Sequence, residues 1–288
     1  MRITDQILRQ GALRSLQARL ASVALAQREV GSGRRISTVS DDPLGATQIM
    51  RFDAQLRDID QYRRTGTAAS TRLSTELAVL DNVRDLISRA HALALSAATF
   101  SPDDPVRKAA LTEVQLIQTQ LVSLGSTRIG NQYIFGGAVT SGPPFLADGS
   151  YVGDQTVLQA EIDTDLTIDV NRPGDQVLSP ALQAVAQLAQ ELATGTTDSI
   201  QATIPVLAAA DQQVLVRQAG VGAGLQQIAD TSTLLGQRAA SVADSRDALQ
   251  GADPTEASLE AVTAQNALER AYAAIGRLFS KSLIDFLS

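Results

Sequence analysis

Large aliphatic residues recur every seven positions along one stretch of the C-terminal half of the chain. They are Ile200, Leu207, Val214, Val221, Ile228, Leu235, Val242 and Leu249. A strict seven-residue apolar period keeps one row of side chains facing partner helices as a helix supercoils. The pattern therefore predicts a helix of roughly 75 Å against which other helices pack. Pro205 and the glycines at 220, 222 and 224 weaken this helix, and a break near either stays open.

Apolar residues that alternate at spacings of three and four predict amphipathic helices at both ends of the chain. The N-terminal helix is expected from Ile3 to about Ile36, and its stripe consists of Leu13, Leu16, Leu20, Val23 and Val30. The C-terminal helix is expected from Thr255 to Ser288, and its stripe consists of Leu268, Tyr272, Ile275, Phe279, Leu283 and Phe286. We predict that these residues form the seam of a coiled coil through which the chain assembles.

A further heptad run lies between these helices, from Ile49 to Ala94. Arg63, Gly66 and Ser70 occupy seam positions in its middle, which indicates a bend or a change of packing partner there. Helix starts are marked four times by a capping residue followed by proline, which suits the first helical position because it has no N–H. The four pairs are Asp42-Pro43, Asp104-Pro105, Ser179-Pro180 and Asp253-Pro254.

The stretch from Asn131 to Val177 differs from the rest, because glycine and proline cluster there and the apolar period falls to two. Residues 158–162 and 166–170 alternate apolar and polar positions around a short connection, which predicts a β-hairpin. The expected fold is therefore mainly α: a long helical bundle or coiled coil built from both chain termini, with a small β-rich insertion.

Composition and charge exclude several classes of function. The 288 residues are 44% hydrophobic but only 3% aromatic, so the core must consist of Leu, Ile, Val and Ala. A net charge of −7 argues against nucleic acid as a partner, and no apolar run is long enough for membrane insertion. The chain has no cysteine. Its N-terminus lacks the apolar core of a cleavable signal peptide, so we expect a cytoplasmic protein or one exported by another route.

No group of residues predicts catalysis, a cofactor or a metal. Asp41-Asp42 and Asp103-Asp104 each precede proline at a helix start, where capping explains them. His91 is the only histidine, and Gly136-Gly137 is not followed by the Lys-Ser/Thr of a phosphate loop. The acidic residues at 163, 165 and 169 do not have calcium-loop spacing. The expected protein is not an enzyme.

The two end helices are complementary in charge. Arginines at 2, 9, 14, 19, 28, 34 and 35 make the N-terminal segment basic, whereas acids at 253, 256, 260, 269 and 285 make the C-terminal one slightly negative. Their apolar stripes alone offset only part of the conformational entropy lost on ordering two such helices. We therefore expect ends that are disordered in the free subunit and helical in an assembly.

Several motifs resemble the flagellin superfamily. The N-terminal Met1-Arg-Ile-Thr4, Gly33-Arg-Arg-Ile36 and the closing segment 280–287 are shared with flagellins. Within the superfamily, the chain resembles the family of hook–filament junction proteins (hook-associated protein 3). The second helix start, Ser40, Asp41, Asp42 and Pro43, is a mark of the superfamily as a whole. The narrower resemblance is carried by the segment 131–136, with Tyr133, Phe135 and Gly136, and then by Pro143, Pro144 and Phe145, followed by Tyr151-Val-Gly-Asp154.

The resemblance implies a structural subunit of the bacterial flagellum that joins hook to filament. It implies three layers: residues 1–38 with 253–288 as a terminal coiled coil, 39–135 with 179–252 as a helical bundle, and 136–178 as a β-rich outer domain. The implied partners are other copies in a ring, a hook-side junction protein (hook-associated protein 1), flagellin, and an export chaperone on the C-terminal helix. The implied location is extracellular, after type III export. A short flagellin and a cytoplasmic helical scaffold or adaptor remain as alternatives.

Overall fold

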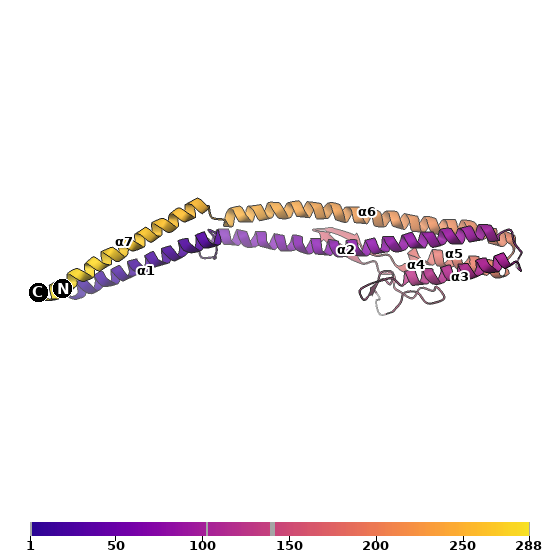
Figure 1. Ribbon diagram of the computed structural model, residues 1–288, viewed down its shortest axis with the longest axis horizontal. Helices are drawn as coiled ribbons and strands as arrows, with labels where there is room; N and C mark the ends of the chain where they lie inside the picture. The colour runs from indigo at the N-terminus through magenta and orange to yellow at the C-terminus, as the bar shows by residue number, and fades with distance from the viewer. Residues whose placement is uncertain (1, 102, 139–141, 288) are drawn as a thin grey trace. The chain divides into compact units, whose positions relative to one another are not determined.

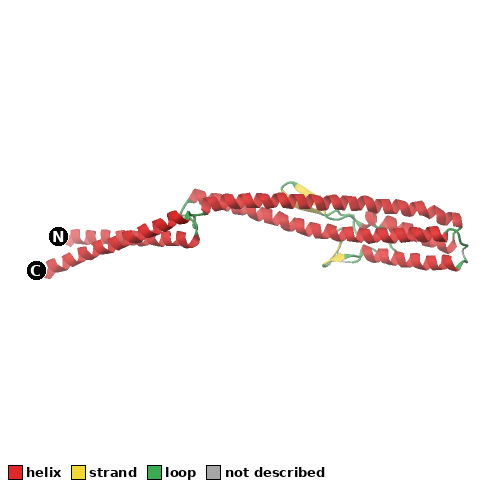
Figure 2. Ribbon diagram, turned by 45° about the horizontal axis from the view of Figure 1, so that its top comes forward, coloured by secondary structure: helices red, strands yellow, loops and turns green. Residues whose placement is uncertain are grey.

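A computed structural model describes residues 2–101, 103–138 and 142–287, with the side chains at 1–6, 8–9 and 278–288 outside that description. Within these ranges the fold is mainly α-helical, as predicted, with two small antiparallel sheets (Figures 1 and 2). The helices are α1 (Arg2–Ser32), α2 (Pro43–Ala97), α3 (Pro105–Gly125), α4 (Gly174–Val177), α5 (Ser179–Thr194), α6 (Thr197–Gln250) and α7 (Pro254–Leu287). The strands are β1 (Arg128–Ile129), β2 (Gln132–Tyr133), β3 (Gln159–Asp163) and β4 (Leu166–Asp169).

The chain divides into two compact units. Residues 1–57 and 238–288 form one, here called the terminal unit, and residues 58–237 form the other, the central unit. The long helices α2 and α6 contribute residues to both. The three-layer division inferred from the sequence stays a prediction.

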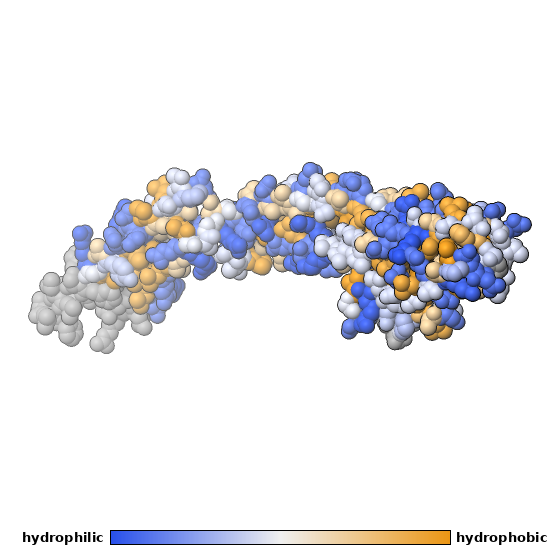
Figure 3. All heavy atoms as spheres, turned by 45° about the vertical axis from the view of Figure 1, so that its right-hand side comes forward, coloured by the Kyte–Doolittle hydropathy of each residue, from blue (hydrophilic) through white to orange (hydrophobic). Residues whose placement is uncertain are grey.

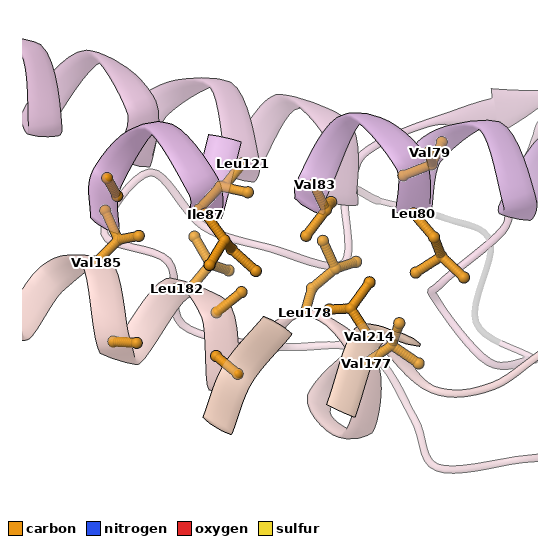
Figure 4. Packing of buried hydrophobic residues seen from close by; sticks show 14 of the residues in the cluster. Val79, Leu80, Val83, Ile87, Leu121, Val177, Leu178, Leu182, Val185 and Val214 are labelled. Atoms are coloured by element: carbon orange, nitrogen blue, oxygen red, sulfur yellow. The ribbon is translucent and has the colours of Figure 1, made fainter. Parts of the chain in front are cut away.

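The core of the central unit lies among α2, α3, α5 and α6. The heptad row of α6 is buried from Ile200 to Leu235, as its period requires. It packs with a matching row on α2 that includes Leu73, Leu80 and Ile87. Figure 4 shows how α2 and α5 supply facing aliphatic side chains, among them Val83 and Ile87 of α2 and Leu182 of α5, with Leu178 just before α5.

The expected weak points of α6 do not break it. The helix is continuous from Thr197 to Gln250. Pro205, Gly220 and Gly222 all lie on its exposed side. There the ring of a proline meets solvent instead of core, and a missing hydrogen bond can be replaced by water. Gly224 has a packing role, since a Cβ built on it would lie 3.2 Å from Ile168 Cδ1 of β4.

All four proline-marked helix starts are present, and three are capped by the preceding aspartate. Asp42 Oδ1 accepts from the Leu44 and Gly45 amides, Asp104 from Val106, and Asp253 from Thr255. The expectation of a cap at Ser179 was wrong. The chain runs from α4 almost directly into α5, and the residue in the cap position is Leu178, which makes no side-chain hydrogen bond to the helix.

The predicted hairpin is formed by β3 and β4, with Ala160 opposite Ile168. A bulge between Glu161 and Asp163 accompanies a positive φ of 59° at Asp165 in the turn. Ile162 is buried, as the alternation of residues 158–162 predicted, but the alternation does not reveal the bulge. The shorter β1–β2 pair lies at the start of this β-rich stretch and was not predicted.

The terminal unit has a much smaller core. Ile36, Ala46 and Ile49 form a buried cluster with Leu249 of α6 packed against it. Backbone hydrogen bonds join the two interhelical connections, from Arg35 N to Gln250 O at 2.9 Å and from Ala252 N to Gly33 O at 3.0 Å. These bonds hold the start of α2 and the end of α6 together.

Candidate assembly surfaces

The terminal helices α1 and α7 pack side by side and run antiparallel (Figure 1). Ala26 of α1 and Ala257 of α7 are buried at this contact. A hollow of about 370 Å³ lies between the helices, lined on one side by Arg19, Ser22 and Ala26 and on the other by Glu260, Thr263 and Ala267. Apart from Leu25, the side chains that line the hollow are small or polar, so the hollow itself covers little apolar surface.

The residues predicted for the coiled-coil seam are only partly covered within one chain. Leu16, Val23, Leu268 and Ile275 are half-buried, whereas Leu13, Leu20, Val30 and Tyr272 are exposed. The side chains of Phe279, Leu283 and Phe286 lie outside the described residues. The assembly role of the whole set stays a prediction.

Further apolar side chains on the same helices are exposed and were missed by the stripe pattern. Leu259 and Val262 of α7 are 64% and 58% exposed, and Leu25 of α1 is 49% exposed. Hydrophobic residues (orange) accordingly reach the surface along the terminal helices in the space-filling view (Figure 3). Helices of a soluble monomer usually direct such residues into a core, and a role of these residues in assembly stays a prediction.

The motif at the start of α2 builds its own turn. Asp41 Oδ2 accepts from the Thr38 and Ser37 amides at 2.7 and 3.0 Å and also from the Ser37 hydroxyl. These bonds, the Thr38 amide first, lower the pKa of Asp41 to about 2. Asp42 caps α2, Pro43 is its first residue, and Ser40 is exposed in the turn. The motif therefore fixes where α2 begins.

The central motif residues Phe135, Phe145 and Tyr151 meet in one cluster. The rings of Phe145 and Tyr151 pack at 5.2 Å with an interplanar angle of 59°. Tyr151 Oη donates to the carbonyl of Phe135, whose side chain is fully buried. A Cβ on Gly125 would lie 2.5 Å from Phe145 Cδ2, so the ring packs directly on the end of α3.

The remaining motif residues frame this cluster. Tyr133 receives the Arg128 guanidinium over its ring at 5.3 Å, and Gly136 and Pro144 are buried. The Pro144 carbonyl accepts from Val152 N at 2.8 Å, while Pro143 is exposed. These contacts give the motif a structural role in folding the insertion onto α3, and its role in recognition stays a prediction.

Two buried polar groups were not predicted from the sequence. Arg107, fully buried near the start of α3, donates to the carbonyls of Leu192, Glu191 and Gly195 at 2.8, 2.5 and 2.6 Å, and so caps the C-terminus of α5. Arg217 of α6 makes a bidentate ion pair with Glu76 of α2 at 2.6 and 2.8 Å. The only feature of the sequence that could have indicated Arg107 or the Glu76–Arg217 pair is a charged residue next to a row of apolar residues.

Neither a metal site nor a membrane span is seen in the described part of the chain. The described His, Asp and Glu side chains include no group of three or more that could hold a metal ion. The described helices also include none that combines the length and apolar character needed to cross a bilayer.

Comparison with known proteins shows similarity to flagellar proteins. Residues 3–140 match the family described as the bacterial flagellin N-terminal helical region. Flagellar hook-associated protein 3 of Escherichia coli K12 is 28% identical over 190 residues, which is 65% of this chain and 60% of that protein. The protein of the same name from Salmonella typhimurium LT2 is 28% identical over 181 residues, covering 62% and 57%. The chain thus spans less than two thirds of these curated relatives.

A solved structure supports the fold. The crystal structure of Bacillus cereus FlgL has a TM-score of 0.62 with 20% identity, covering 68% of this chain and 99% of that one. At that identity the similarity demonstrates a shared fold. The relatives' names and the flagellin match confirm the resemblance to hook-associated protein 3 that the motifs indicated.

Proposed function

We propose that the chain is a structural, non-enzymatic subunit that joins the hook to the filament of the bacterial flagellum. The observation that carries this proposal is the exposed apolar face of α1 and α7, in a chain similar to flagellar hook-associated protein 3. The exposed large apolar residues of the two helices include Leu13, Leu20 and Val30 on α1, and Leu259, Val262 and Tyr272 on α7, and we infer that they belong to one contact surface. Such a face is stabilised when other subunits cover it.

The partners follow from a position between hook and filament. The subunit would associate with copies of itself in a ring, with a hook-side junction protein (hook-associated protein 1) and with flagellin. The C-terminal helix would be bound by an export chaperone before secretion, since its apolar face must be covered in the cell. The protein would act outside the cell after export without a cleavable signal peptide. It would need no cofactor.

The first experiment is electron microscopy of cells that lack the gene, with flagellin measured in the medium. We expect bare hooks and flagellin lost to the medium, because filament subunits would have no junction on which to assemble. Absent filaments without secreted flagellin would instead identify a short flagellin. Normal flagella would contradict both and favour a cytoplasmic scaffold or adaptor.

Complementation then tests the exposed face itself. A plasmid copy with Leu13→Asp and Leu20→Asp should fail to restore filaments, because two charges would enter the contact between subunits. The matched control is Leu95→Asp, a substitution at an equally exposed leucine of α2 in the central unit. Restoration by the terminal variant would contradict assembly through this face.

A further inference from the structure

The two apolar rows that join α2 to α6 do not fix how far one helix lies along the other. Both rows repeat every seven residues. They consist of Leu73, Leu80, Ile87 and Ala94 on α2 and of Ile200, Leu207, Val214, Val221 and Ile228 on α6. Sliding either helix by one heptad, about 10 Å, would therefore bring each aliphatic side chain level with another member of the opposite row.

The connections of the central unit let all four of its long helices share such a shift. Residues 98–104 join α2 to α3, and residues 195–196 join α5 to α6, so the helices are linked in two pairs. Between the pairs, α2 packs with α6 and α3 packs with α5. The register of one pair on the other therefore depends on side chains that fit a single partner position.

Polar side chains of this kind join α2 to α6 beside the apolar rows. Arg84 Nε donates to Asp211 Oδ1 at 2.9 Å, and Arg84 Nη1 donates to Gln218 Oε1 at 3.4 Å. Gln218 Nε2 donates in turn to Asp81 Oδ1 at 2.6 Å. Gln218 is only 8% exposed, and Asp211 precedes it by one heptad. The network thus occupies two successive positions of the α6 repeat.

Two further polar contacts cross from one helix pair to the other. Glu76 of α2 is bound by Arg217 of α6 through two hydrogen bonds, and the fully buried Arg107 of α3 binds carbonyls at the end of α5. A shift of one heptad would replace Arg217 by Gly224 or by Ala210, and neither residue carries a charge. Glu76 would then be a buried carboxylate without its counter-charge, which is strongly destabilising.

We propose that these polar contacts select one register among several that the apolar rows alone would allow. The residues that make them, here called the register contacts, are Glu76, Asp81, Arg84, Arg107, Asp211, Arg217 and Gln218. The apolar rows supply the attraction between the helix pairs. The register contacts supply specificity, because each shifted register leaves buried polar groups unpaired. The selection takes place within one chain, so it is independent of the proposed function.

The distance between two spin labels measures the register, because the chain has no cysteine of its own. Labels are placed at the exposed positions Thr71→Cys of α2 and Ala208→Cys of α6. Ala208 lines the same hollow as Ser88 of α2, so the labels are separated by about 25 Å along the helix axis. A shift of one heptad changes this separation by about 10 Å. Full-length labelled chain is mixed with excess unlabelled chain, so that only distances within one copy are counted.

The first variant removes the register contacts between the helix pairs. Its substitutions are Glu76→Leu, Arg84→Met, Arg107→Met, Asp211→Leu, Arg217→Met and Gln218→Leu. We expect a helical chain with more than one label distance, separated by about 10 Å, whereas the unsubstituted labelled chain should give one. The matched control, Asn82→Leu with Gln213→Leu, adds leucines at exposed positions of the same helices and should also give one. A single unshifted distance in the first variant would overturn the proposal.

Exchange of charges tests the same selection should the first variant fail to fold. In a chain with Arg107→Met, Arg84→Glu and Arg217→Glu place carboxylates against Asp211 and Glu76, and the wild-type distance should no longer be the only one. Adding Glu76→Arg and Asp211→Arg restores both pairs with reversed sign and should return the single wild-type distance. The proposal is wrong if the first exchange leaves the distance unchanged, or if the second does not restore it.

Discussion

Phe145 approaches the end of α3 more closely than a side chain on Gly125 would allow. A Cβ there would lie 2.5 Å from the ring, whereas one on the exposed Gly220 of α6 would have nothing within 4 Å. We expect Gly125→Ala to lower the free energy of unfolding by about 1–3 kcal/mol through overpacking. Gly220→Ala should raise it by about 0.5–1 kcal/mol, since alanine favours the helix. Urea unfolding of both variants tests the prediction, and a change of the same sign in each would contradict it.

Asp41 gives the turn before α2 a specific dependence on pH. Its pKa is lowered from 3.8 to about 2, chiefly by the Thr38 amide, so the folded state favours the carboxylate. The stabilisation is complete above the ordinary pKa and is lost as the pH falls toward 2. We expect an NMR titration to place the Asp41 carboxyl midpoint near 2.

Asp41→Asn should correspondingly flatten the decline of stability between about pH 4 and pH 2. Ser40→Ala is the matched control, because it alters the same exposed turn without removing a carboxyl group. If the asparagine variant loses unfolding free energy between pH 4 and pH 2 as steeply as the wild type, Asp41 does not contribute to the acid dependence and the prediction is wrong.

Single residues show where sequence reasoning fails. The aspartates before proline were predicted as caps because a cap and its helix are adjacent in the chain. Arg107 was not predicted, because it binds the carbonyl of Leu192 on another helix. Periodicity describes the faces of one helix and contains no information on which helix end a buried cation will meet.

Among the elements, α2 and α6 are joined by an ion pair as well as by their apolar rows. Glu76 is 2% exposed and is bound by Arg217 through two hydrogen bonds. Glu76→Gln should lower the free energy of unfolding by about 3 kcal/mol, because it leaves the largely buried guanidinium without its counter-charge. Thermal or urea unfolding of the full chain provides the measurement.

Two comparisons sharpen that experiment. Asp60→Asn removes a partner of the exposed Arg64 on α2 and should cost at most about 0.5 kcal/mol. The double variant Glu76→Leu with Arg217→Met should recover most of the loss, because it removes both charges together. If the double variant is as unstable as Glu76→Gln, the unpaired charge of Arg217 is not the reason for the lost stability.

Element types were more predictable than their internal details. The seven-residue row located α6 because six of its residues, Ile200 to Leu235, face one continuous core. The open question of a break in α6 depended on whether Pro205 faces core or solvent, which its local sequence does not determine. Likewise, alternation predicted the β3–β4 hairpin but not its bulge. The predicted seam contains four of the six exposed apolar residues named for the terminal helices, whereas Leu259 and Val262 lie outside its stripe.

At the scale of the whole molecule, the terminal unit buries less apolar surface than the central one. Its buried hydrophobic residues, among those described, are Ala26, Ile36, Ala46, Ile49 and Ala257, and its helices leave several leucines and valines exposed. The central unit instead buries complete rows of aliphatic side chains on four helices. Because amide protection follows local burial and contact density, the two units should open with very different free energies.

We therefore expect hydrogen exchange of the free chain to be at least on the order of a hundredfold faster in α1 and α7 than around Leu80 and Ile87 of α2. Mass spectrometry of peptides from the free chain and from isolated hook–filament particles makes the comparison. The α2 peptide is an internal control, because its core is complete within one chain and its protection should be equal in both samples. Assembly should protect α1 and α7, since neighbouring copies would cover their apolar faces. Equal protection of the terminal helices in the free and assembled states would show that they are stable without neighbours.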